Sequence, residues 1–164
     1  THDQEEALSI ADRIFVMDSG KIMQSGTPED IYANSSNPFV ANFIGMTNFI
    51  EGQVVDEDSI KVDNQRIAIN SHSHKKGTKV IIAARPEYVQ LAEKNSSNTF
   101  VGRVVDVEFL GSFLRIHLET SIMPDQPLIA DKPMIDNFSK SVAIGDNLNF
   151  TLSPNHLNVY ECDN

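Results

Sequence analysis

The sequence lacks the features that mark disulfide-bonded, membrane-spanning or nucleic-acid-binding chains. Its 164 residues include one cysteine, Cys162, so no disulfide can form within the chain, and a single thiol fits a reducing compartment. No run of about 18 apolar residues occurs, so we expect no membrane-spanning helix. Basic residues are scarce: 13 Lys and Arg stand against 23 Asp and Glu, a net charge of −10. That balance opposes contact with a phosphate backbone, and we expect no nucleic-acid binding.

The sequence also lacks the glycine-rich loop that cradles phosphates. Such a loop, Gly-x-x-x-x-Gly-Lys-Ser/Thr, holds ATP through its backbone amides and its lysine. Here Gly20-Lys21 is followed by Ile22, and Phe15 occupies the earlier glycine position. We therefore expect that this chain neither binds ATP with useful affinity nor hydrolyses it, and that it holds no cofactor or metal of its own.

The first 45 residues contain three helix starts and one hairpin signal. Ile14–Met17 and Lys21–Gln24 flank a short turn, which predicts a β-hairpin with Gly20 at positive φ. Gly45 predicts the end of the third helix. Each helix start is predicted from a capping side chain ahead of acidic residues or a proline: Asp3, Thr27 with Pro28, and Asn37 with Pro38.

From residue 46 onward, short β-rich stretches alternate with turn residues. Strands at this spacing indicate a small barrel or sandwich rather than a parallel α/β sheet. We therefore predict a mainly β protein with two parts, a short α/β segment at 1–45 and a β-rich domain at 46–164. The predicted strands are 49–55, 60–62, 67–69, 79–84, 100–110, 113–118, 127–130, 148–152 and 157–160.

Several segments resemble a known family of transport proteins. Thr1–Leu8 and Gly26–Tyr32 are similar to the C-terminal end of an ATP-binding cassette, and Asn37–Gly45 is similar to the segment that follows it. Arg85-Pro86-Glu87 and Gly102–Gly111 resemble the next domain of that family, a transport-associated OB-like (TOBE) β-barrel. The resemblance is to the ATPase subunits of bacterial ABC importers for maltose, polyamines, iron(III), sulfate or phosphonates.

The resemblance implies that this chain is the C-terminal part of a longer subunit. Residues 1–45 would be the tail of its nucleotide-binding domain, and residues 46–164 would be the OB-like regulatory domain. In the longer subunit the cofactors are ATP and Mg²⁺, and His2 is the switch histidine beside the γ-phosphate. The metal-binding aspartate, the catalytic glutamate and the signature loop would precede Thr1. The resemblance thus assigns catalysis to the parent, and association and regulation to this chain.

The resemblance also implies partners and a location. Two copies would form a homodimer around two ATP molecules and move the permease subunits, while the regulatory domain holds the copies together and responds to a solute or a regulatory protein. The expected location is cytoplasmic, peripheral on the inner face of the bacterial plasma membrane. The hairpin strand at Ile14–Met17 needs cover on its open edge. We expect it to pack against the barrel or a second copy, by exchange of residues 1–45.

Two polar clusters outside these motifs have both a functional and a structural interpretation. His72 and His74 would present two imidazoles on one side of an extended segment, as a metal pair requires. Lys75 and Lys76 follow directly and oppose a cation, so a polar loop is the favoured interpretation. The run Asp56-Glu57-Asp58 does not converge on one point in a strand or tight turn, which favours a solvated turn.

The arginines leave open an alternative function, a small-anion or solute-binding OB-like module. Pro86 keeps Arg85 out of the helical conformation, so the chain is predicted to change direction there. An ion pair between Arg85 and Glu87 that fixes this corner is favoured over a ligand contact. An anion site would need converging cations, and the candidates are Arg66, Arg85, Arg103 and Arg115.

Overall fold

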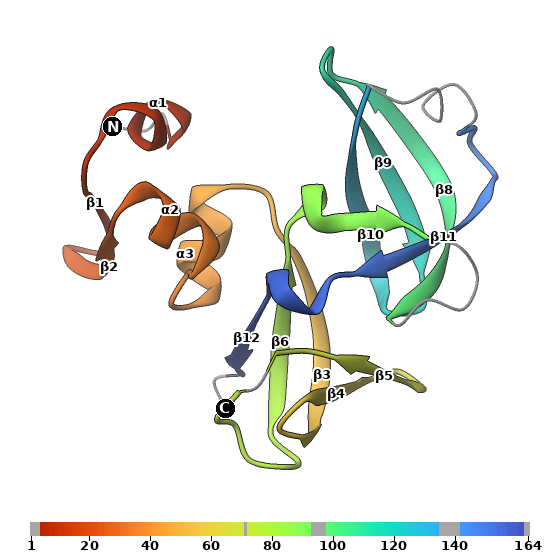
Figure 1. Cartoon of the computed structure of the whole chain (residues 1–164), viewed down its shortest axis with the longest axis horizontal. Coiled ribbons are helices and arrows are strands. Elements are labelled where there is room, and N and C mark those ends of the chain that lie inside the picture. Colours follow the sequence, from red (N-terminus) through yellow and green to blue (C-terminus); the bar gives the residue numbers. More distant parts are fainter. Residues whose placement is uncertain (1–3, 71, 93–97, 135–141, 163–164) are drawn as a thin grey trace. The chain divides into compact units, whose positions relative to one another are not determined.

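The structure, a computed structural model, describes residues 4–70, 72–92, 98–134 and 142–162 (Figure 1). The chain divides into two compact units, Thr1–Thr47 and Asn48–Asn164. The first unit mixes short helices with a hairpin, and the second consists of strands joined by turns. This arrangement confirms the predicted fold class, a mainly β protein with a short α/β segment ahead of it. Among the described residues, no helix is long and apolar enough to cross a membrane.

The first unit is built around a β-hairpin. Its strands β1 and β2 pair antiparallel, and the turn residues Ser19 and Gly20 have φ of +47° and +77°. Two successive positive φ values suit a tight hairpin turn, so the predicted role of Gly20 is confirmed. The elements of this unit are α1 (Gln4–Ile10), β1 (Ile14–Asp18), β2 (Lys21–Gly26), α2 (Pro28–Ala33) and α3 (Pro38–Ile44).

Helices α2 and α3 begin at the predicted caps. The Thr27 hydroxyl accepts a hydrogen bond from the Asp30 amide at 3.2 Å, and the Asn37 side chain accepts one from the Val40 amide at 2.9 Å. A proline occupies the first turn of each helix, where its missing N–H leaves no partner unsatisfied. The predicted cap Asp3 lies outside the described residues. These helices and β1 enclose a small core of Val16, Ile31, Val40 and Ile44.

The second unit consists of two antiparallel five-stranded sheets. One sheet has the order β12-β6-β3-β4-β5 and the other β10-β9-β8-β11-β7. In Figure 1, β8 and β9 form a long curved pair within the second sheet. The strands are β3 (Asn48–Asp56), β4 (Ser59–Val62), β5 (Gln65–Ala68), β6 (Lys79–Ala84), β7 (Val89–Leu91), β8 (Thr99–Phe109), β9 (Phe113–Thr120), β10 (Met123–Pro133), β11 (Asn147–Leu152) and β12 (Leu157–Glu161).

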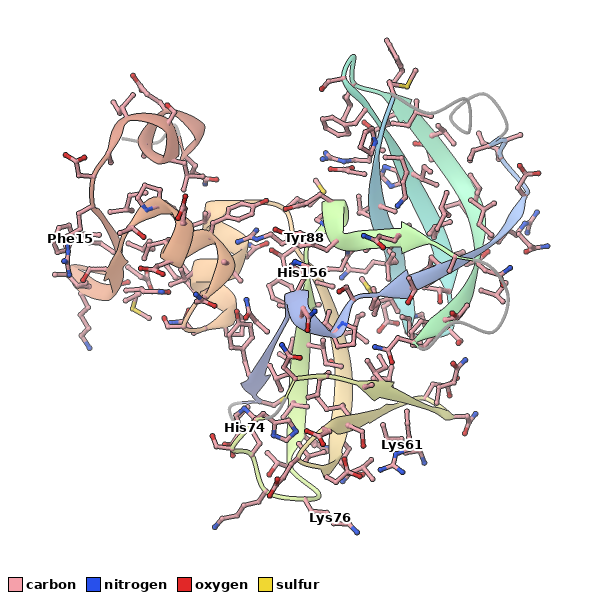
Figure 2. The ribbon with its side chains drawn as sticks, in the orientation of Figure 1. Phe15, Lys61, His74, Lys76, Tyr88 and His156 are labelled. Carbon is pink, nitrogen blue, oxygen red and sulfur yellow. The ribbon has the colours of Figure 1, made fainter. Side chains whose placement is uncertain are left out.

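Two segments carry the chain from one sheet to the other, in opposite directions. Strand β6 leads through the 3₁₀ turn η1 (Pro86–Tyr88) into β7, and β11 leads through η3 (Pro154–His156) into β12. Strand β6 pairs with β12, and β7 pairs with β11, so each crossing segment pairs with the other at both ends. The ring centroids of Tyr88 and His156 are 4.0 Å apart, with the rings stacked (Figure 2). The two crossings therefore form one interlocked connection between the sheets.

The two sheets share one apolar core. Ile50 and Ile82 from the first sheet belong to the same buried cluster as Ile116, Leu118 and Phe150 from the second, and all five side chains are fully buried. Chains of this length gain most of their stability from such burial.

Two buried asparagines also join the sheets. Asn48 on β3 exchanges two hydrogen bonds with the backbone of Ile129 on β10, at 2.9 and 2.8 Å. Asn98 bonds both backbone groups of Ala68 at 2.7 Å and the Leu152 carbonyl at 3.0 Å. We call these contacts the asparagine bridges. Each side-chain amide thereby satisfies backbone groups of a strand in the other sheet.

Candidate functional site

The predicted switch histidine, His2, lies outside the described residues. Its role beside a nucleotide in a longer subunit stays a prediction. The remaining candidate residues all lie in the second unit, on the two sheets and the turns between their strands.

The structure brings His72 and His74 together but engages both rings in local contacts. The ring centroids lie 5.4 Å apart. The Nδ1 atom of His72 accepts a hydrogen bond from the His74 amide at 3.1 Å, and Nε2 of His74 lies 3.3 Å from the Val159 carbonyl oxygen. Each imidazole therefore has one nitrogen occupied by the backbone. These contacts fit the favoured interpretation of a polar loop, and Figure 2 shows His74 and Lys76 on this loop.

The acidic turn at Asp56-Glu57-Asp58 is held by hydrogen bonds within its own hairpin. Asp56 accepts from the Ser59 hydroxyl at 2.6 Å and from the Asp58 amide at 3.3 Å, and it pairs with Arg66. The Ser59 hydrogen bond is the main cause that lowers the pKa of Asp56, with the Asp58 amide and Arg66 acting in the same direction. The Asp56 carboxylate therefore makes its contacts within its own hairpin, which fits the interpretation of this run as a solvated turn.

The four candidate arginines are divided between the two sheets: Arg66 and Arg85 belong with the first, and Arg103 and Arg115 with the second. Arg66 lies on β5 in one sheet and Arg115 on β9 in the other. Arg115 donates two hydrogen bonds to Asp131, at 2.9 and 2.8 Å, and this contact raises the pKa of the guanidinium. Arg66 forms an ion pair with Asp56. Two of the four cations thus already have a carboxylate partner, which opposes the converging-arginine hypothesis.

The Arg85-Pro86-Glu87 corner is the first of the two crossings between the sheets. Arg85 has φ −78° and ψ +146°, the extended conformation that a following proline favours, and Pro86 begins η1. The predicted change of direction after β6 is therefore confirmed. Arg85 is buried, with 7% of its surface exposed, so it lies inside the fold and not on an open binding surface. Its pairing with Glu87 stays a prediction.

Sequence reasoning missed Lys132. Its ammonium group is half-buried on β10 and donates a hydrogen bond to the Val89 carbonyl at 2.6 Å. Burial lowers the pKa of Lys132 from 10.5 to about 8. The signal for this residue is weak, because a lysine in the polar run Ala130–Pro133 is typical of an exposed strand end.

Sequence reasoning also missed a cluster of Asp106, Glu108 and His117 on β8 and β9. One potential ligand atom from each side chain lies within 4.8 Å of the other two. The Nε2 atom of His117 is 2.5 Å from a carboxylate oxygen of Glu108. The alternation Asp106-x-Glu108 within a predicted strand is a usable signal for one shared face. The position of His117, across from Asp106 on the neighbouring strand, depends on the strand register, which the sequence does not specify.

A hollow of about 360 Å³ opens beside β3 and the turn before β10. Its lining includes the apolar side chains of Phe49 and Met123 and three carboxylates, those of Glu51, Asp63 and Asp125. Carboxylates favour a cationic occupant over an anion.

The comparisons with known proteins agree on one family. Residues 82–159 match the TOBE domain. The chain is 31% identical over 159 residues to the spermidine/putrescine import ATP-binding protein PotA of Clostridium acetobutylicum, covering 97% of this chain and 42% of that protein. It is 38% identical over 143 residues to the Fe(3+) ions import ATP-binding protein FbpC 2 of Rhizobium meliloti, covering 80% and 36%. The chain thus spans less than half the length of these relatives.

One solved structure supports the fold independently. The cytoplasmic molybdate-binding protein ModG, solved with molybdate bound, superimposes with a TM-score of 0.58 at 11% identity. The superposition covers 68% of this chain and 94% of that one. At this identity the likeness shows the fold alone, and it confirms the predicted OB-like β-barrel.

Proposed function

Because this chain is a relative of the C-terminal part of bacterial ABC importer ATP-binding subunits and contains a TOBE domain, we propose that it serves in association and regulation. The observation that carries the proposal is the similarity over 159 residues, nearly the whole chain, to such a subunit. The fold is consistent with this role, since the second unit is a strand-built domain with its own core. Catalysis would belong to the rest of the parent subunit.

In the proposed parent, ATP and Mg²⁺ are the cofactors and His2 contacts the γ-phosphate. Two subunits would close around two nucleotides and move the permease subunits, at the cytoplasmic face of the plasma membrane. The phosphoryl-transfer step needs a phosphate-binding loop and metal ligands to position and neutralise the γ-phosphate. Since this chain has no such loop in its sequence, its contribution is to hold two copies together and to adjust their activity.

Two measurements on the purified chain test this division of labour. We expect light scattering after size exclusion to show a dimer, and we expect no ATP turnover above the buffer rate. The variant His2→Ala is the control for hydrolysis, because a true switch histidine is needed only where a nucleotide site exists. ATP turnover that His2→Ala abolishes would show that the chain is itself catalytic and would contradict the proposal.

A second candidate function is solute binding by the OB-like domain. The observation that favours it is the acidic hollow bounded by Glu51, Asp63 and Asp125, together with the fold shared with ModG. The carboxylates favour a cationic solute over the small anion that the arginines were considered for. A thermal-shift panel of polyamines, iron citrate, sulfate, molybdate and a phosphonate tests both. Stabilisation by a polyamine, lost in Glu51→Gln, supports solute binding, and no shift across the panel supports a purely protein-interaction role.

A further inference from the structure

The bulge in β8 rearranges which side chains share a face of the sheet. Ahead of it, Val104 pairs with Leu118 and is buried in the core. With unbroken register, Asp106 would pair with Ile116 and also point into the core. The extra residue at the bulge instead pairs Asp106 with His117 and Val107 with Ile116. Such a bulge shifts every later side chain to the opposite face.

This shift gathers three metal-ligating groups on the outer face. Asp106 and Glu108 are two residues apart on β8, so they lie on the same face, and His117 is directly across on β9. The ligand atoms of all three lie within 4.8 Å of one another. Both carboxylates are exposed and His117 is half-buried, which leaves the cluster open to ions from solution.

The neighbouring cation, Arg115, makes its side-chain hydrogen bonds outside this cluster. Arg115 lies directly across from Glu108, and the charge of Glu108 contributes to the raised pKa of Arg115. Its guanidinium donates two hydrogen bonds to Asp131 on β10, at 2.9 and 2.8 Å. Glu108 reaches diagonally to Nε2 of His117, at 2.5 Å. The two carboxylates therefore meet an imidazole nitrogen, while Arg115 gives its hydrogen bonds to Asp131.

We propose that Asp106, Glu108 and His117 form a binding site for a divalent transition metal ion such as Zn²⁺. Zinc takes one imidazole nitrogen and carboxylate oxygens at about 2.0–2.2 Å and completes a tetrahedron with water. Such ligand atoms lie about 3.4 Å apart, so atoms within 4.8 Å reach this geometry through side-chain rotation. The imidazole favours zinc, cobalt or nickel over magnesium and calcium, which prefer oxygen ligands. The ion would link β8 to β9 beside the bulge.

The test is a titration of the full 164-residue chain, stripped of metal by EDTA and carrying no histidine tag. We expect one equivalent of Zn²⁺ to bind in isothermal titration, and Co²⁺ to give a d–d absorption band. His117→Gln and Asp106→Asn are each expected to lower the affinity at least 10-fold, as loss of a ligand does. The matched control replaces the other histidine pair, His72→Gln with His74→Gln, and should leave the affinity unchanged.

A stability measurement separates loss of the site from loss of the fold. Zn²⁺ should raise the melting temperature of the unsubstituted chain but not that of the His117→Gln variant, and the two should melt at the same temperature in EDTA. If His117→Gln does not fold, Asp106→Asn, an exposed substitution, answers the same question. Absence of saturable Zn²⁺ binding in the unsubstituted chain overturns the proposal, and the cluster is then a surface ion pair between His117 and Glu108. Binding that survives His117→Gln but is lost in the His72/His74 control also overturns it.

Discussion

At the scale of single residues, Lys132 shows how burial changes chemistry that the sequence does not reveal. Its ammonium donates to the Val89 carbonyl from a half-buried position, and desolvation disfavours its charged form. The sequence indicated neither the burial nor the partner, because both depend on β7 packing near β10. By contrast, the caps Thr27 and Asn37 were predictable, since each acts on an amide three residues away.

The lowered pKa of Lys132 predicts a specific dependence of stability on pH. The unfolded chain holds this proton up to a pKa of 10.5, and the folded chain releases it at about 8. Between these values the unfolded state binds more protons, so the free energy of unfolding rises with pH. Below the folded-state pKa both states are protonated and this residue adds no slope.

Urea denaturation from pH 7 to 10.5 measures how the free energy of unfolding changes with pH in the unsubstituted chain and in the Lys132→Met variant. We expect the rise in stability above pH 8 to be smaller in Lys132→Met. Lys61→Met is the control, since Lys61 is an exposed lysine on β4 and should leave the slope unchanged. An equal rise of the free energy of unfolding with pH in Lys132→Met and in the unsubstituted chain would contradict the buried-ammonium interpretation.

At the scale of elements, most strands were predictable from short β-rich stretches between turn residues. Strand β6 was predicted at its observed bounds, and β3 and β8 within one residue at each end. Strand β7 was missed, because its three residues follow directly on η1 and carry no pattern of their own. Strand β10 is longer than predicted, since a register irregularity between Met123 and Leu128 carries the pairing with β9 past Pro124. The sheet order and the crossings depend on contacts distant in sequence.

The asparagine bridges predict a measurable cost when one amide is removed. Asn98 has φ of +54°, and its side chain makes three hydrogen bonds to Ala68 and Leu152. Asn98→Ala leaves these partly buried backbone groups without this partner, and we expect a loss of about 2–3 kcal/mol in the free energy of unfolding. Chemical denaturation measures the loss.

Asn98→Gly separates the two physical causes at this position. Glycine adopts positive φ without strain but lacks the amide, so a loss close to that of Asn98→Ala shows that the hydrogen bonds are responsible. If Asn98→Gly is as stable as the unsubstituted chain, the amide bridge contributes nothing, and the loss in Asn98→Ala comes from backbone strain alone.

At the scale of the whole molecule, the first unit exposes a large apolar surface. Phe15, Met17 and Ile22 on its hairpin are 55%, 54% and 58% exposed, alongside other exposed apolar side chains of α1 and α3. Exposed apolar residues grouped in this way mark surfaces that another element or copy covers. The sequence predicted that this hairpin needs a partner, and its packing against the barrel or a second copy stays a prediction.

Serine substitutions on the hairpin test that expectation. We expect the triple variant of Phe15, Met17 and Ile22 to shift the chain from dimer toward monomer in light scattering. Ile144→Ser is the matched control, since Ile144 is 68% exposed in the other unit and should not affect association. If the unsubstituted 164-residue chain is a monodisperse monomer at high concentration, association through this surface is refuted.

The division of labour between catalysis and regulation is tested most directly in a reconstituted importer. The proposed parent subunit, with its permease in lipid vesicles, is compared with the same subunit lacking residues 48–164, and ATP hydrolysis is measured with and without solute. We predict that the deleted subunit still hydrolyses ATP but no longer responds to solute or to a regulatory protein. Hydrolysis that disappears with these residues, or a response that persists without them, would contradict the proposed regulatory role.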